Sequence, residues 1–281
     1  MQSRFTPLQA IYGATFFYAI HYAVTLYVES SFLGSFITPE RIGIFFTVAS
    51  LLSVFAYFKA THLIRRFTNY NFLLGVSLLE VVFLVLLAFA NSMLVALVVF
   101  TLHQVVLSLL FLSLTISLET YSRDESTGRN RGVFLTILNS AILMGPLIAS
   151  SGIAEGGYRT IFLMGAFLLM PMLFIIGSRF RTFRKPLYDK ISFVKGFQQL
   201  VAKKDIRGTV FIQFMLEFFY SIMVIYTPLY LTTQIGIPLG TVLGVIFPIA
   251  LLPFVIFPYF LGNISDTKLG EKELLATGFI I

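Results

Sequence analysis

Long apolar runs alternate with short polar segments along the whole chain. Most runs are about 19 to 26 residues long, which is the length a helix needs to cross the hydrocarbon core while bonding its own backbone groups. The pattern predicts membrane-spanning helices near residues 8–28, 41–59, 72–90, 93–118, 132–151, 159–178, 209–231 and 239–260. A further apolar run starts at Glu273. We therefore expect an all-α polytopic membrane protein.

Composition supports this interpretation. Hydrophobic residues make up 57% of the chain and charged residues 12%, against about 45–50% and about 25% in soluble domains. A soluble core could not bury so large an apolar fraction. The chain has no cysteine, which excludes disulfides and thiolate metal sites. We expect neither a metal nor a cofactor.

The net charge of +7 reflects how Lys and Arg residues are distributed between the two sides of the membrane. With the amino terminus in the cytoplasm, all but two of the 20 Lys and Arg residues fall on the cytoplasmic side, the exceptions being Arg41 and Arg159. This is the asymmetry of the positive-inside rule. It predicts an integral protein of the cell membrane with a cytoplasmic N-terminus. The expected partner of the basic residues is the lipid bilayer rather than nucleic acid.

A repeat at an offset of 202 residues divides the chain. Phe16-Phe17-Tyr18-Ala19-Ile20 matches Phe218-Phe219-Tyr220-Ser221-Ile222, and Thr25 matches Thr227. An even number of spans between the copies makes this a parallel repeat of six helices. We expect a six-helix bundle over 1–178, a basic cytoplasmic linker with an amphipathic helix over 179–206, and an incomplete second bundle over 207–281. In this interpretation the chain is a fragment of a twelve-helix protein, truncated after the start of the ninth helix.

Two stretches resemble a known family. The loop over 262–272 carries Gly262, Asp266, Gly270 and Lys272 at the positions of a loop signature of the major facilitator superfamily of secondary transporters. In the first half Arg65 and Arg66 keep the basic character of that loop, whereas Ala60 and Ile64 replace its glycine and aspartate. The resemblance implies that these residues belong to cytoplasmic gate loops.

The stretch "RNRGVFLTILNSAILMGPLIASSG" resembles the fifth helix of the same family. Arg131 lies at its entry and is included among the gate residues, and Gly145-Pro146 lies at the place of the family's helix-five bend. The resemblance covers almost the entire chain. It implies two helical halves that alternately expose a central cavity to each side of the membrane.

Polar residues recur at helical spacing within three apolar runs, and such residues in a membrane span tend to face the protein interior or a wet cavity. The expected cavity residues are Tyr18, His21, Tyr22 and Thr25 of the first span, Gln104 and Ser108 of the fourth, and Gln213, Glu217, Tyr220 and Thr227 of the seventh. In the family these helices line the central cavity, so pattern and resemblance indicate the same surface.

Glu217 is the sharpest single candidate in the sequence. A carboxylate in an apolar setting could take up and release a proton as its exposure alternates. His21 could exchange protons or simply pack. A packing role is favoured for His103, and Glu80 ranks below Glu217.

The leading function hypothesis is a secondary transporter that moves a small solute of unknown identity by alternating access, with protons as a candidate coupling ion. The alternatives are a non-transporting membrane scaffold or remnant and a membrane-embedded enzyme. An enzyme is not expected, because the chain lacks the H-E-x-x-H, G-x-S-x-G and phosphate-loop motifs. The sequence leaves substrate, direction of transport and oligomeric state open.

Overall fold

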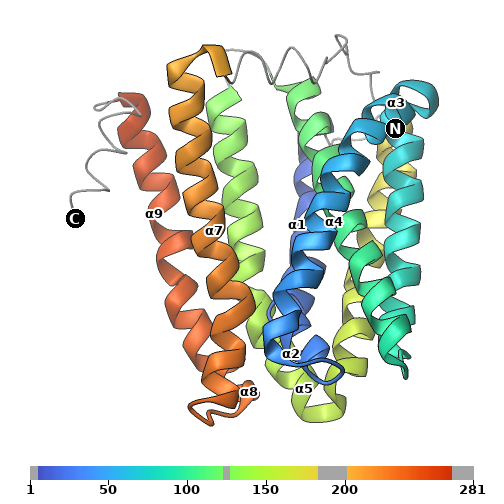
Figure 1. Cartoon of the computed structure of the whole chain (residues 1–281). Helices are drawn as coiled ribbons and strands as arrows, with labels where there is room; N and C mark the ends of the chain where they lie inside the picture. Colours follow the sequence, from blue (N-terminus) through green and yellow to red (C-terminus); the bar gives the residue numbers. More distant parts are fainter. Residues whose placement is uncertain (1–5, 123–126, 183–200, 268–281) are drawn as a thin grey trace.

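The computed structural model describes residues 6–122, 127–182 and 201–267 (Figure 1). Every regular element among these residues is helical. The elements are α1 (Pro7–Leu26), α2 (Glu29–Gly34), α3 (Pro39–Ala88), α4 (Met93–Tyr121), α5 (Thr127–Arg179), η2 (Phe180–Thr182), α7 (Lys204–Thr233), α8 (Leu239–Thr241), η3 (Val242–Ile246) and α9 (Phe247–Thr267). Seven of the described helical stretches are long and apolar enough to span a membrane. The expected all-α polytopic fold is confirmed.

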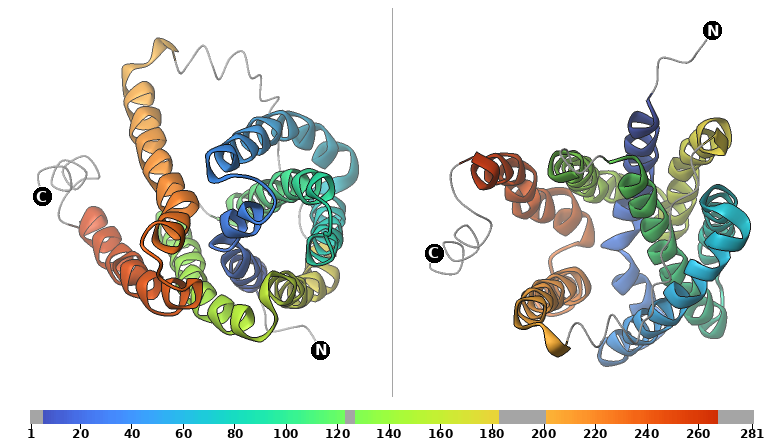
Figure 2. Two further views of the ribbon diagram at one scale, coloured as in Figure 1. Left: turned by 60° about the horizontal axis from the view of Figure 1, so that its bottom comes forward. Right: turned by 90° about the horizontal axis from the view of Figure 1, so that it is seen from above.

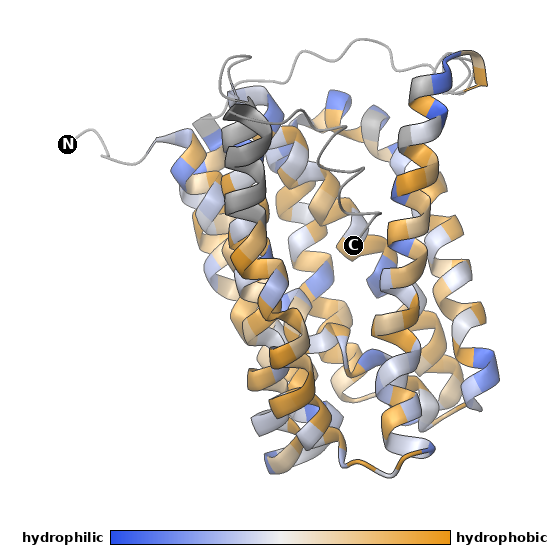
Figure 3. Cartoon of the chain, turned by 90° about the vertical axis from the view of Figure 1, so that its left-hand side faces the viewer, coloured by the Kyte–Doolittle hydropathy of each residue, from blue (hydrophilic) through white to orange (hydrophobic). Residues whose placement is uncertain are grey.

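We name the two ends of the bundle after one residue at each. The Gly236 end holds residues 35–38, 89–92, 156–157 and 234–238, and the Thr68 end holds residues 68, 122, 180–182 and 201–204 (Figure 1). Polar residues gather toward the two ends, and apolar residues cover most of the length between them (Figure 3). This is the distribution expected for helices that cross a bilayer.

Helix α1 begins at a capping box and lies at the centre of the bundle (Figure 2). The hydroxyl of Thr6 accepts a hydrogen bond from the Gln9 amide at 3.3 Å, and the Gln9 side chain accepts one from the Thr6 amide at 2.8 Å. Pro7 occupies the first helical turn, where its missing N–H costs nothing. The expected first span thus has a defined start, and it stops at Leu26, with the short helix α2 beginning at Glu29.

Helix α3 contains two of the expected spans, separated by a break at Thr68. This residue has φ 74° and ψ 153°, a backbone conformation that residues other than glycine seldom adopt. The next residue, Asn69, is buried and ties the break to α4: its amide donates to Ser117 Oγ at 2.8 Å, and it accepts from Ser113 Oγ at 2.6 Å. The two arms of α3 are therefore joined by a fixed bend.

Helix α5 also contains two expected spans. Its break lies at Gly156 and at Gly157, whose φ of 66° suits a residue without a Cβ. The first arm lies on the side of α7 and α9, and the second arm lies behind α3 and α4 (Figure 1). Helix α5 consequently packs on both sides of α1. The backbone dihedral angles are helical through Gly145 and Pro146, and the expected bend there remains a prediction; the chain leaves helical geometry further along, at the two glycines.

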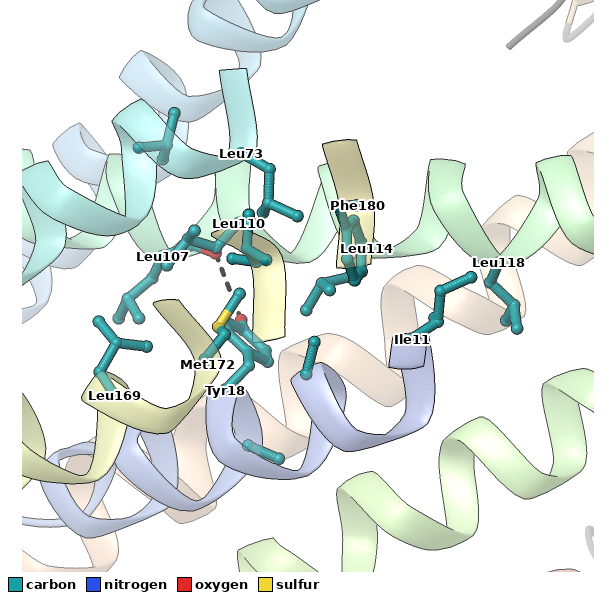
Figure 4. Packing of buried hydrophobic residues seen from close by; sticks show 14 of the residues in the cluster. Ile11, Tyr18, Leu73, Leu107, Leu110, Leu114, Leu118, Leu169, Met172 and Phe180 are labelled. Atoms are coloured by element: carbon teal, nitrogen blue, oxygen red, sulfur yellow. Dashed lines mark hydrogen bonds between the residues drawn. The ribbon is translucent and has the colours of Figure 1, made fainter. Parts of the chain in front are cut away.

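The largest hydrophobic cluster joins α1, α3, α4 and the second arm of α5. Figure 4 shows side chains of this cluster interdigitating around Tyr18, whose hydroxyl donates to the carbonyl oxygen of Leu107 at 3.3 Å. Leu110, Leu114, Leu169 and Ile11 in this cluster are fully buried. Tyr18 satisfies its single polar atom inside an otherwise apolar core, as a buried tyrosine must.

Helix α7 and the start of α9 pack against the rest of the bundle at the Gly236 end. A second cluster there contains Tyr27, Val28, Val224, Leu243 and Phe247, all buried. The rings of Tyr27 and Phe247 lie 4.6 Å apart. The division of the chain at 178 and 206 remains a prediction, since residues 183–200 of the expected linker lie outside the described residues.

Candidate functional site

Four helices bring ionisable side chains together inside the apolar bundle. His21 comes from α1, Glu29 from the first position of α2, Glu80 from the second arm of α3 and His103 from α4. All four have 0% of their surface exposed. A buried charge without a partner is costly, so such groups are expected to pair. Together with Gln104, we refer to these residues as the buried network.

His103 bridges the two carboxylates. Its Nε2 lies 3.1 Å from Glu29 Oε1, and its Nδ1 lies 2.8 Å from Glu80 Oε1. The amide of Gln104 donates to Glu29 Oε2. His21 Nε2 lies 3.5 Å from the same Glu80 oxygen that contacts His103. One imidazole therefore connects α2 to α3, and a second imidazole adds α1.

The contacts of Glu80 are ionic rather than directional. Neither oxygen of Glu80 has a partner in hydrogen-bond geometry among the described residues, and the same holds for both ring nitrogens of His21. Leaving a buried polar group without a hydrogen bond costs about 1–3 kcal/mol. Glu80 is thus held by charge and burial, whereas Glu29 is held by hydrogen bonds to His103 and Gln104.

The number of protons in the buried network follows from these distances. His103 Nε2 and Nδ1 each lie within 3.1 Å of a carboxylate oxygen, and two unprotonated atoms so close would repel each other, so one atom of each pair carries a hydrogen. Glu29, His103 and Glu80 thus share two protons and carry a net charge of −1. With His21 carrying the single ring proton of a neutral imidazole, one further proton, on His21 or on a carboxylate, makes the four groups neutral, which is the cheapest charge state in an apolar interior.

The expected polar stripe of α1 lies in the protein interior. Tyr18, His21 and Thr25 are buried, and Tyr22 is half-buried. The hydroxyl of Thr25 bonds the carbonyl of Tyr22 at 3.1 Å, within its own helix. The rings of Tyr18 and Tyr22 stack with centroids 6.0 Å apart. Of this stripe, His21 alone joins the buried network.

The expected stripe of α4 divides in the same way. Gln104 is part-buried and binds Glu29, whereas the hydroxyl of Ser108 donates to the carbonyl of Val105 at 2.7 Å. His103, favoured from the sequence as a packing side chain, is instead the centre of the buried network.

The stripe of α7 is separate from the buried network. Gln213 and Glu217 are exposed, and the Gln213 amide donates to Glu217 Oε1 at 2.8 Å. Tyr220 and Thr227 are half-buried nearer the Gly236 end. Glu217 therefore has a neighbour on its own helix, and its coupling role remains a prediction.

The expected gate residues lie at or near the Thr68 end. Arg65 and Arg66 are exposed there, with the Arg66 guanidinium 5.3 Å from the ring centroid of Phe67. Arg131 forms a 2.8 Å ion pair with Glu119 across the ends of α5 and α4. Gly262 and Asp266 are in the last turns of α9. Gly270 and Lys272 lie outside the described residues.

Sequence reasoning missed Glu29 and did not foresee that Glu80 and His103 contact each other. Glu29 directly follows the first apolar run, a position typical of a loop residue. In the structure it is instead the first residue of α2, and it is buried. His103 lies one position off the polar stripe of its helix. The available signal was the number of ionisable residues inside apolar runs, because two acids and two imidazoles in one half suggest mutual neutralisation.

Comparison with known families assigns the chain. The sequence model described as Major Facilitator Superfamily matches residues 10–281. The chain belongs to the Major Facilitator Superfamily. As a member of that superfamily it is an integral membrane protein and a membrane transporter. None of the curated proteins compared with the chain matches it. No group of ionisable side chains in the described part of this transporter has the arrangement of a metal site.

Proposed function

We propose that this protein is a secondary active transporter that moves a small solute across the cell membrane by alternating access, with protons as the coupling ion. Alternating access needs two groups of helices that close against each other at one end while they separate at the other. The observation that carries the proposal is the unequal contact of α7 with the remaining helices along its length.

Contacts at the Gly236 end are close and apolar. Phe32 and Leu33 of α2 share a cluster with Ile225 and Leu229 of α7. On the other side of α1, the hydroxyl of Ser150 in α5 donates to the carbonyl of Gly240 at 2.9 Å. These contacts support a closed state of the Gly236 end.

Toward the Thr68 end α7 is largely uncovered. Phe211, Phe214 and Glu217 are all exposed there. This difference between the two ends of one helix supports an arrangement that is closed at the Gly236 end and open at the Thr68 end.

The charge distribution supports an orientation. Basic residues concentrate at the Thr68 end, including Arg65, Arg66 and Arg131, whereas Arg41 and Arg159 lie near the Gly236 end. By the positive-inside rule the Thr68 end faces the cytoplasm. The arrangement is then inward-facing, with a cytoplasmic N-terminus.

Half-buried side chains suggest where a solute binds. Tyr22, Gln104 and Tyr220 are half-buried members of the three expected stripes. Aromatic rings and amides bind neutral polar or aromatic solutes through stacking and hydrogen bonds. The other expected cavity residues, which we propose support Tyr22, Gln104 and Tyr220 in this binding site, are Tyr18, His21, Thr25, Ser108, Gln213 and Thr227.

Flux measurements test the function. The protein is reconstituted in proteoliposomes, and a library of solutes is screened for uptake driven by an imposed proton gradient. Glu217→Gln is expected to abolish the proton dependence while leaving downhill exchange, because glutamine keeps the shape but cannot ionise. Glu119→Gln, which alters an exposed ion pair instead, is the matched control. Proton-independent movement of every transported solute would contradict the coupling.

A further inference from the structure

Helix α2 connects the buried network to the closure at the Gly236 end. Its first residue, Glu29, is bound by His103 and Gln104 of α4. Within the next turn, Phe32 and Leu33 are buried beside Leu229 of α7. A helix of six residues moves as one rigid unit. A change in the hydrogen bonds of Glu29 at its start therefore also shifts Leu33, which packs against α7.

A turn separates α2 from α1. Between Leu26 and Glu29 the chain leaves the helix at Tyr27 and Val28, and no side chain caps the start of α2. The polar side-chain anchors at the start of α2 are the two contacts of the Glu29 carboxylate with α4, beside the burial of Val28. This arrangement makes Glu29 the point at which the charge of the buried network acts on α2.

We propose that the buried network is a proton-binding site whose occupancy fixes α2 to α4 and thereby keeps the Gly236 end closed. This inference rests on the proposed function, since it names the site through which a coupled proton acts. It adds four buried groups as a second proton-holding position, beside the exposed carboxylate of Glu217 that the flux experiment tests.

The charge balance explains how occupancy controls α2. With four protons on Glu29, His21, Glu80 and His103, counting the ring N–H of a neutral His21, the buried network is neutral and both nitrogens of His103 have a hydrogen to share. When one proton leaves to water, a net negative charge remains in an apolar interior and one carboxylate contact loses its hydrogen. Glu29, at the start of α2, is the carboxylate that can turn toward water.

The other titratable groups around the buried network are phenols. Tyr18 lies near Glu80 and Tyr22 lies near Glu29; Tyr57 of α3 neighbours Tyr18, and Tyr27 and Tyr220 neighbour Tyr22. Phenols ordinarily titrate near pH 10, above the range in which a histidine–carboxylate cluster is expected to respond. A response between about pH 5 and pH 8 can therefore be assigned to the buried network.

Distance measurements on the closure test the inference. The chain has no cysteine, so Ser35→Cys in the turn after α2 and Gln234→Cys after α7, both exposed, can carry a pair of spin labels without a background. In lipid nanodiscs the label distance is expected to lengthen when the pH is raised from about 5 to about 8. Glu29→Gln and His103→Gln should each remove this change in distance, because a glutamine amide does not take up or release a proton in this pH range.

Two further variants make the result decisive. Glu119→Gln removes a carboxylate of α4 outside the buried network and should leave the pH response intact. If a single substitution in the buried network prevents folding, the double variant Glu29→Gln with His103→Gln places two amides opposite each other, which can bond mutually. A pH response that persists in the double variant, or a parent protein without any response, overturns the inference.

The outcomes separate this inference from the proposed function. A pH-dependent distance that Glu29→Gln abolishes, without proton-driven flux of any solute, would remove the proposed function and keep the proton site. Proton-driven flux together with an unchanged label distance would keep the function and remove the site.

Discussion

Gly145 of α5 lies directly against Ala23 of α1, so closely that a Cβ at position 145 would overlap the Ala23 side chain and backbone. The glycine expected from the sequence to permit a helix bend thus serves a close approach of two helices. Small residues at such crossings are a general device of membrane proteins, because van der Waals contact drives helix association there.

Gly145→Ala is expected to destabilise the protein by about 1–3 kcal/mol, the usual cost of an added methyl group in a packed site. The measurement is the thermal unfolding midpoint in detergent. Gly177→Ala in the same helix is the control, because a Cβ at that position meets no atom within 4 Å. Equal midpoints for the two variants would contradict the close approach.

His103→Leu should destabilise the protein much more than any change to a surface ion pair. It leaves Glu29 and Glu80 buried without their shared cation, and breaking a buried pair costs about 3–5 kcal/mol. Arg131→Gln breaks the exposed pair with Glu119 and should cost about 1 kcal/mol or less. Denaturation followed by circular dichroism compares the two. Similar losses would show that His103 does not neutralise the carboxylates.

Thr68→Gly is expected to be more stable than Thr68→Ala by about 1 kcal/mol, because glycine adopts positive φ without strain and alanine does not. Both variants lose the hydroxyl that accepts from the Asn71 amide at 3.4 Å, so their difference isolates the backbone conformation. The unfolding midpoints of the two variants provide the measurement. An alanine variant as stable as the glycine variant would rule out the strained bend.

Ser150→Val should open the Gly236 end. Valine cannot donate a hydrogen bond to the Gly240 carbonyl. Its methyl groups would also crowd Gly244, because a Cβ built on Gly244 would lie only 2.9 Å from Ser150 Oγ. A probe cysteine at Leu243, which is fully buried in this closure, should then react with a maleimide several-fold faster. Ser151→Val is the control, since Ser151 is exposed and its hydroxyl donates to the Ile148 carbonyl of its own helix. Equal labelling rates would contradict a closing role for Ser150.

The helical architecture follows from the sequence because run length and hydrophobicity are local properties. Each expected span through residue 260 has a helical counterpart. The bends were not predictable in the same way. Thr68 is not a residue that signals positive φ, and it is held by Asn69 and its serine partners on α4, which are 44 and 48 residues further along the chain. The expected bend at Pro146 remains a prediction, since the helical backbone continues through it and the structure adds a close contact of Gly145 with Ala23.

The buried network was only partly predictable, for a similar reason. Helical spacing identifies residues that share a face of one helix, but it does not tell which faces of two helices meet. His21 was expected among the cavity residues, whereas the partnership of Glu29 with His103 depends on the break after Leu26 that turns Glu29 inward. Glu217 attracted the hypothesis because it stands alone in an apolar run, yet in the structure it is exposed beside Gln213.

The separation of Glu29 from its bridging partner has a consequence for biosynthesis. Glu29 emerges from the ribosome 74 residues before His103, and the segment Pro7–Gly34 that carries it is the least hydrophobic of the seven candidate spans. Until α4 enters the bilayer, this acid has no cation to neutralise it. Stable placement of the first segment therefore awaits the fourth, so the N-terminal helices must be integrated together rather than one at a time.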